Sequence, residues 1–279
     1  MSASGSSERI RFLRETLAGL EHVQGGMAPA PVRRLAFAHK EAGCALDRLL
    51  GGLFSGALYE TAPARMGDLA AAAGFALALA ARYADGHEGA ILWMSDEFSA
   101  RENGAPYGPG IAAHGLDASR LVFVRAQGGA DLLWAVEEAL RCAAPSVIVA
   151  DLGSAARHFD LVAARRLTQA ARTSGAPAIL IHPAGAFRRA QAQNGARMRF
   201  EISARPSVTP AQQGIRPVPG PAHFGVRLAK PGVEAGRMTG LDTDITRTLI
   251  WDHRHGSFRD PLSLAAPAAS GAGDRRDSA

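Results

Sequence analysis

Short apolar runs alternate with longer amphipathic segments through the middle of the chain. The runs lie at Ala57–Thr61, Ala90–Ser95, Leu121–Arg125, Val147–Asp151 and Ala178–His182. Each is bounded by residues that favour turns, and helical patterns separate them, including an alanine-rich one after the first run, Asp131–Cys142 and Phe159–Thr173. Strands alternating with helices predict βαβ units, right-handed crossovers and a mostly parallel, buried sheet.

The rhythm changes at the segment Arg197–Arg205, where apolar and charged residues alternate with a period of two. This pattern predicts a half-exposed strand. Two more strands are predicted at Phe224–Ala229 and Thr248–Asp252, and we expect them to extend the sheet's edge in antiparallel fashion. The predicted fold class is therefore a three-layer α/β/α core with antiparallel strands at its C-terminal edge.

The N-terminal region carries one helical stripe, formed by Ile10, Leu13, Leu17 and Leu20, and a glycine pair followed by a linker ends it. This amphipathic helix either folds back on its own domain or docks onto a partner. The predicted organisation is a helix and linker at 1–31, one α/β domain at 32–257 and a disordered Ala/Ser/Gly/Pro-rich tail at 258–279.

The stretch from Leu46 to Ala81 has the strand–loop–helix order of a phosphate-binding P-loop, G-x-x-x-x-G-K-[ST]. Here the loop reads Ala62-Pro63-Ala64-Arg65-Met66-Gly67-Asp68-Leu69. Asp68 stands where the phosphate-binding lysine should be, and Leu69 offers Mg²⁺ no oxygen. Pro63 lacks an N–H donor, and Ala62 adds a Cβ where close backbone approach favours glycine. Because charge-assisted hydrogen bonds contribute about 1.5–3 kcal/mol each, we expect no tight nucleotide binding, no nucleotide cofactor and no catalytic residues.

Composition also argues against nucleotide binding, and the distribution of charge identifies a basic region. The 279 residues include only two lysines, Lys40 and Lys230, and neither lies in a glycine-rich loop. The formal net charge is +5, and the segment Arg188–Arg216 holds six arginines and one acid. This region is a candidate contact for DNA or an acidic partner, or else a solvated basic face. Its candidate contact residues are Arg188, Arg189, Arg197, Arg199 and Arg205.

Other features exclude several classes of protein. Cys44 and Cys142 have neither metal-ligand spacing nor a disulfide framework. The N-terminus has no signal-peptide pattern, and the longest uncharged apolar run, Leu69–Ala81, is 13 residues, too short to span a bilayer. We therefore predict a soluble cytoplasmic protein.

Carboxylates and histidines do not form a convincing chemical site. Asp151 ends a strand, either as a remnant of Mg²⁺ binding or as a cap of the next turn. We expect Asp96 and Glu97 to be solvated loop charges. The pair His253-x-His255 has no third ligand at suitable spacing, so no metal site is predicted, and no nucleophile-elbow pattern is present.

Several segments together resemble the RecA-like recombinases, and in particular the ImuA family, over roughly residues 35–255. They are the lead-in LDRLLGG, the strand ILWMS before Asp96-Glu97, the strand SVIVAD ending in Asp151, the strand AILIH before the loop Pro183–Ala196, the strand RMRFEISAR and the ending FGVRLAKPGVEAG…TRTLIWD. The resemblance implies a nucleotide-independent accessory protein of SOS-induced translesion synthesis and mutagenesis after DNA damage. The partners it implies are RecA, an ImuB-type inactive Y-family polymerase homologue, an error-prone replicative-type DNA polymerase and, as a further candidate, DNA.

Three alternatives stay open. SulA, a cell-division inhibitor that binds the tubulin-like division protein, has a similar RecA-like fold without a working P-loop. Capture of that division protein without RecA would favour this function. An ATPase with an atypical site would bind nucleotide and Mg²⁺ in a titration. The third alternative is a RecA-like fold with an unrelated binding role.

Overall fold

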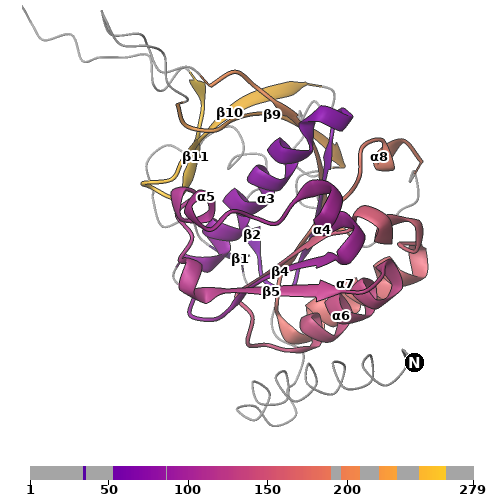
Figure 1. Cartoon of the computed structure of the whole chain (residues 1–279). Coiled ribbons are helices and arrows are strands. Elements are labelled where there is room, and N and C mark those ends of the chain that lie inside the picture. Colours follow the sequence, from indigo (N-terminus) through magenta and orange to yellow (C-terminus); the bar gives the residue numbers. More distant parts are fainter. Residues whose placement is uncertain are drawn as a thin grey trace, which may run out of the picture.

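A nine-stranded sheet with helices on both faces forms the body of the protein (Figure 1). The structure is a computed structural model that describes residues 34–35, 53–85, 87–189, 196–207, 220–230 and 245–261. The strands of the sheet are β3 (Leu58–Pro63), β4 (Ile91–Asp96), β5 (Leu121–Ala126), β6 (Val147–Asp151), β7 (Ala178–Ile181), β8 (Met198–Ala204), β9 (His223–Lys230), β10 (Thr246–Asp252) and β11 (Ser257–Arg259).

Their order across the sheet is β11-β10-β9-β8-β3-β7-β6-β4-β5. The neighbours from β8 to β5 pair in parallel, whereas β9, β10 and β11 add in antiparallel fashion. A separate two-stranded antiparallel pair consists of β1 (Arg34–Leu35) and β2 (Leu53–Phe54). The prediction of a mostly parallel sheet with antiparallel C-terminal edge strands is confirmed.

Helices cover the sheet in two layers, with α3 on one face and α6 and α7 on the other. The helices are α3 (Leu69–Ala84), α4 (Glu97–Asn103), α5 (Gly108–Ala113), α6 (Gly129–Arg141), α7 (Leu161–Ser174) and the short α8 (Ala186–Arg189). Three 3₁₀ turns are η1 (Met66–Asp68), η2 (Ala118–Arg120) and η3 (Gly153–Arg157). None of the described helices is long and apolar enough to cross a membrane.

An aromatic cluster joins α3 to the antiparallel part of the sheet. The ring of Phe75 lies 5.4 Å from Phe200, 5.8 Å from Phe224 and 5.3 Å from Phe258, measured between centroids. Because most neighbours of Phe75 along α3 are alanines, the helix can approach the sheet closely and let one large side chain fill the interface. This packing holds β8, β9 and β11 to the parallel core.

The structure differs from the sequence-based predictions both in its elements and in the burial of one strand. The helices α4 and α5 and the strand β11 were not predicted, and β11 continues the sheet to Arg259. The strand predicted to be half-exposed is instead largely buried, because β8 lies inside the sheet between β3 and β9. The N-terminal stripe, the Leu46–Gly52 lead-in, residues 208–219 and the tail from 262 onward lie outside the described residues.

Candidate functional site

Two backbone amides of the loop after β3 already donate hydrogen bonds to carbonyls of the protein. The Ala64 N–H donates to the carbonyl of Ile202 at 2.8 Å, and the Asp68 N–H donates to the carbonyl of Arg65 at 2.9 Å. Pro63 has no N–H to offer. A P-loop needs successive amides that converge on an anion, so this loop lacks three of the donors that such a cradle would use.

The side chain of Asp68 connects the start of α3 to the end of β8. The residue is only 4% exposed, and its Oδ1 accepts a hydrogen bond of 3.0 Å from the backbone N–H of Ala204, at the end of β8. Its Oδ2 lies 3.5 Å from Nε of Arg65, at the outer limit for a hydrogen bond. A lysine could not accept the hydrogen bond from the Ala204 N–H. Asp68, which stands in the place of the phosphate-binding lysine, therefore also stabilises the loop.

The other positions of the motif fit the same conclusion. Leu69 begins α3 and packs partly against the core, and Ala62 is buried in β3. Gly67 has no left-handed backbone angle, and a Cβ added to it would meet no atom within 4 Å. This part of the loop therefore does not need the conformational freedom of glycine.

Asp96 and Asp151 lie in a hydrogen-bonded network at the carboxyl ends of β4 and β6. Asp96 is fully buried and caps α4, accepting from the Ser99 N–H at 2.8 Å and from the Ser99 hydroxyl at 2.9 Å. The Ser154 hydroxyl donates to the same carboxylate at 2.9 Å. Asp151 accepts from the Asn103 amide at 3.2 Å and from the Gly153 N–H at 3.1 Å.

The prediction of Asp96 as a solvated charge was therefore wrong, because its partners Ser99 and Ser154 lie in α4 and η3, two elements that the sequence pattern did not predict. Glu97 does lie on the surface, where it pairs with Arg101 at 2.6 Å. Burial raises the pKa of Asp151, the bonds from Asn103 and Gly153 oppose this shift, and the charge of Asp96 adds to it. Among the described residues no three His, Cys, Asp or Glu side chains form a group suited to a metal ion.

A second buried network lies beneath α8, on strands β3, β7 and β8. Glu60 is completely buried, and its carboxylate lies 2.6 Å from Nε of Arg199, which is 7% exposed. His182, just after β7, lies between the rings of Phe159 and Phe187 at 5.2 and 5.5 Å. Burial, with the charge of Arg199, lowers the pKa of His182 to about 3. Its imidazole is therefore neutral at pH 7, and the 3.7 Å separation from Glu60 is not an ion pair.

This network bears on the candidate contact residues Arg197, Arg199 and Arg205, because they differ in exposure. Arg199 is buried and forms the ion pair with Glu60. Arg197 is half-buried, and its guanidinium lies 3.4 Å from the centroid of the Phe54 ring. Arg205 alone of these three is exposed. Arg188 and Arg189 end α8, and their side chains lie outside what the structure describes.

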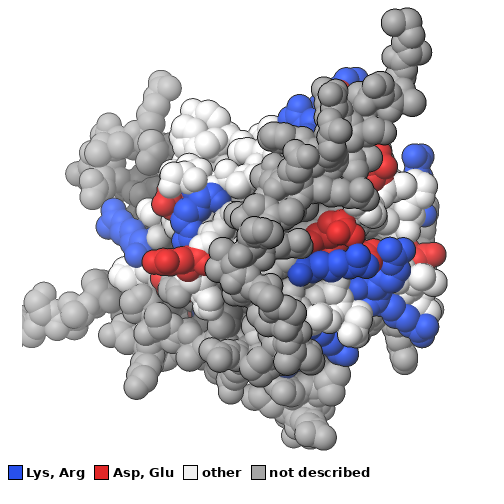
Figure 2. Space-filling view, turned by 90° about the horizontal axis from the view of Figure 1, so that it is seen from below, with Lys and Arg blue, Asp and Glu red and all other residues white. Residues whose placement is uncertain are grey.

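The charges on the described surface are mixed in sign. On the side shown in Figure 2, blue basic groups gather most densely at the right, with red acidic groups beside them. Glu137 of α6 pairs at 2.6 Å with Arg141 of the same helix and with Arg166 of α7, so the charge of these two arginines is partly neutralised. Such pairs reduce the attraction of the region for phosphate.

These observations define the protein as an α/β protein that keeps the strand–loop–helix frame of a nucleotide-binding fold but closes its phosphate loop with side-chain and backbone hydrogen bonds. No family model matches the chain. It is 30% identical over 189 residues to the protein ImuA of Caulobacter vibrioides, in strains NA1000 / CB15N and ATCC 19089 / CIP 103742 / CB 15, an overlap of 64% of this chain and 72% of the relative. The chain belongs to the ImuA family. At the level of the family, this membership supports a role in damage-inducible mutagenesis.

Proposed function

We propose that the protein is a non-catalytic accessory factor of SOS-induced translesion synthesis in the cytoplasm, which acts by binding RecA and mutasome proteins. The observation that carries this proposal is the closed loop after β3. Asp68 is buried against the end of β8, and the amides of Ala64 and Asp68 are already bonded to carbonyls. A protein built this way acts through its surfaces rather than through a nucleotide cycle.

The expected partners are RecA, an ImuB-type inactive Y-family polymerase homologue and an error-prone replicative-type DNA polymerase. We propose that the N-terminal stripe of Ile10, Leu13, Leu17 and Leu20 contributes to RecA binding, because an amphipathic helix joined by a linker can lay its apolar face on a partner. Among Arg197, Arg199 and Arg205 only Arg205 is exposed, so we give protein partners precedence over DNA.

A pull-down from DNA-damaged cells tests this function. The full chain is expected to retain RecA and the ImuB-type protein. Removal of residues 1–31 is expected to abolish RecA capture, because it deletes the proposed contact and removes no residue of the described sheet. The Val162→Ala variant, which changes an exposed residue of α7, serves as the control and should retain RecA.

Two outcomes would contradict the proposal. Undiminished RecA capture by the truncated chain would show that the N-terminal stripe does not contribute to RecA binding. Capture of the tubulin-like division protein, with neither RecA nor the ImuB-type protein, would favour a division inhibitor instead.

A further inference from the structure

Three exposed arginines without a carboxylate partner lie on the surface that η3 and α7 form. They are Arg157, Arg165 and Arg172, and none of them forms an ion pair with any described residue. Residues 153–174 hold four arginines and a single acid, a formal excess of +3. The fourth arginine, Arg166, pairs with a glutamate of α6. The other three therefore carry positive charge that the described residues do not neutralise.

The acid of this segment is already used as a helix cap. Asp160 precedes α7, and its Oδ1 accepts a hydrogen bond of 2.8 Å from the Ala163 N–H. The helix α7 itself contains no aspartate or glutamate. Arg157 donates from Nε to Nε2 of His158 at 3.0 Å, a bond to an uncharged acceptor that leaves the charge of the guanidinium in place. Positive charge therefore prevails from η3 to the end of α7.

Two of these arginines lie in one line along α7. Arg165 and Arg172 are seven positions apart, so they return to nearly the same side of the helix and are separated by a rise of about 10 Å. Arg166 lies about 100° round the helix from Arg165, and its ion pair shows that α6 is on that side. Figure 2 views the molecule from below, where α6 and α7 lie in Figure 1, and its basic groups gather most densely at the right.

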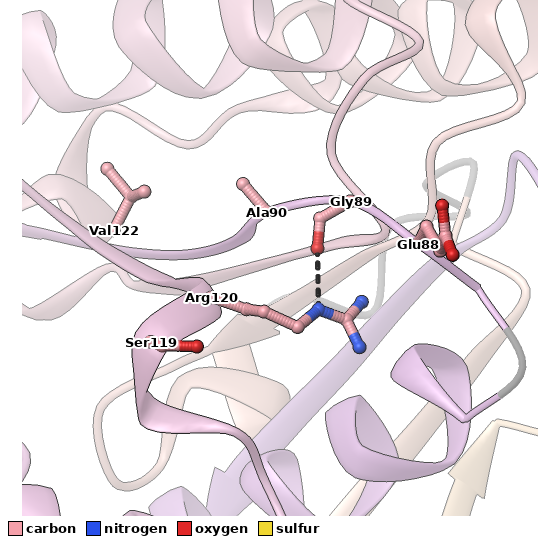
Figure 3. A pocket seen from close by; sticks show the side chains of 6 residues that line it. All are labelled: Glu88, Gly89, Ala90, Ser119, Arg120 and Val122. Carbon is pink, nitrogen blue, oxygen red and sulfur yellow. Dashed lines mark hydrogen bonds between the residues drawn. The ribbon is translucent and has the colours of Figure 1, made fainter.

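The arginine at the pocket beside β5 shows the opposite arrangement (Figure 3). This pocket of about 430 Å³ is lined by Glu88, Gly89, Ala90, Ser119, Arg120 and Val122. The Arg120 guanidinium donates to the carbonyls of Gly89 at 3.0 Å and Ala84 at 3.3 Å, so its donors stabilise the protein itself. Arg165 and Arg172 make no such bonds to described residues, and each keeps its five N–H donors for an external anion.

We propose that the arginine surface, defined by Arg157, Arg165 and Arg172, binds the phosphate backbone of double-stranded DNA without sequence preference. Guanidinium groups bind phosphate oxygens in bidentate fashion, and duplex DNA offers one negative charge per about 1.7 Å of its axis. Gln169 and Thr173 are exposed on the same helix, and side chains of both types commonly contact phosphate and sugar.

The side chains around the arginines favour a duplex over other occupants. The exposed aromatic residues of the described chain are Phe98, Tyr107 and Phe123, and none lies on η3 or α7, so the surface has no ring on which unpaired bases could stack. A protein partner usually requires an apolar centre. The residue between the two arginines of α7 on its exposed side is Gln169, and the exposed Val162 lies at the start of the helix, before both.

Fluorescence anisotropy with a short labelled duplex, added to the full chain, tests the proposal. With three phosphate contacts, the logarithm of the binding constant should fall against the logarithm of salt concentration with a slope of about −3, or about forty-fold between about 50 mM and about 200 mM salt. The variant Arg165→Gln/Arg172→Gln should reduce this slope to about −1 and weaken binding at the lower salt concentration at least about ten-fold.

A control of equal charge separates the surface from the net charge of the protein. Arg101→Gln/Arg254→Gln removes two exposed arginines from α4 and from the turn between β10 and β11. It should keep the natural slope and leave duplex binding within about two-fold, because neither residue lies near α7 in sequence or on its surface. Equal losses in the two double variants would overturn the proposal, as would undiminished binding by Arg165→Gln/Arg172→Gln.

Two further probes test the other occupants. A single strand of the same length should bind more weakly than the duplex, and tighter binding of the single strand would contradict a surface without base stacking. Poly-glutamate that bound as tightly as the duplex, and lost binding in Arg165→Gln/Arg172→Gln, would assign the surface to an acidic protein and overturn the proposal. The arginine surface shares no residue with the closed loop or with residues 1–31, so duplex binding and RecA capture can fail separately.

Discussion

Replacing Arg199 by alanine is expected to lower the free energy of unfolding by about 3–5 kcal/mol, because it breaks a buried ion pair by removing one of the two charges. Glu60 has no solvent exposure, and the Arg199 guanidinium lies 2.6 Å from it. Urea unfolding at pH 7 measures the effect. An effect of this size would also reduce partner binding through misfolding, so such a loss must not be taken as evidence of an exposed contact.

Two comparisons separate the ion pair from ordinary surface charge. Arg205→Ala, on an exposed residue of the same segment, should change stability by no more than about 0.5 kcal/mol. The double variant Glu60→Leu/Arg199→Met should recover much of the lost stability, because replacing both partners leaves no unpaired charge. A stability loss for Arg199→Ala as small as that for Arg205→Ala would refute the burial of this pair.

Acid is expected to destabilise the protein through His182. The unfolded imidazole takes up a proton near pH 6.5, whereas the folded one resists protonation down to about pH 3. The unfolded state therefore binds more protons between these values, so stability is complete above pH 6.5 and falls as the pH decreases. The loss is about 1.4 kcal/mol per pH unit, or about 4–5 kcal/mol over the whole interval.

The His182→Phe variant isolates this contribution, because phenylalanine keeps an aromatic ring between Phe159 and Phe187 but cannot titrate. Unfolding free energies measured from pH 7.5 to pH 4 should fall less steeply for the variant than for the natural chain. His158→Gln, on an exposed histidine, is the control and should keep the natural slope. Parallel curves for the natural chain and His182→Phe would show that the buried imidazole does not govern the acid response.

The apolar runs predicted the parallel strands well, because a strand buried on both faces must be apolar along its length. Val147–Asp151 is a clear case, since the prediction and β6 have the same bounds. The helices α4 and α5 escaped because they are seven and six residues long, too short to show a full amphipathic period. The spacing of Asp96 and Ser99, a cap residue and the amide that it binds, was the available signal for α4.

Long-range pairs explain what the sequence could not provide. Arg199 and Glu60 are separated by 139 residues, and Ala204 and Asp68 by 136, so no local pattern shows that they meet. A single acid in the otherwise uncharged strand Leu58–Pro63 does indicate that a buried partner is required. It does not identify that partner, and for this reason Arg199 was assigned to an exposed face.

The loss of phosphate chemistry, in contrast, could be predicted from Asp68 and Leu69 directly, since neither residue type can perform the missing function. The structure adds a reason why the loss is not easily reversed. The Asp68 carboxylate and the Ala64 amide both bond to β8, so the loop is part of the sheet's packing. Replacing Asp68 by lysine and Leu69 by serine would therefore not bring back the missing amide donors.

Isothermal titration of the full chain with ATP and Mg²⁺ tests this account most directly. We predict no binding tighter than about millimolar, equivalent to roughly 4 kcal/mol, and the same result for the Asp68→Lys/Leu69→Ser variant. Saturable micromolar binding by the natural chain would contradict the closed loop and the non-catalytic function built on it.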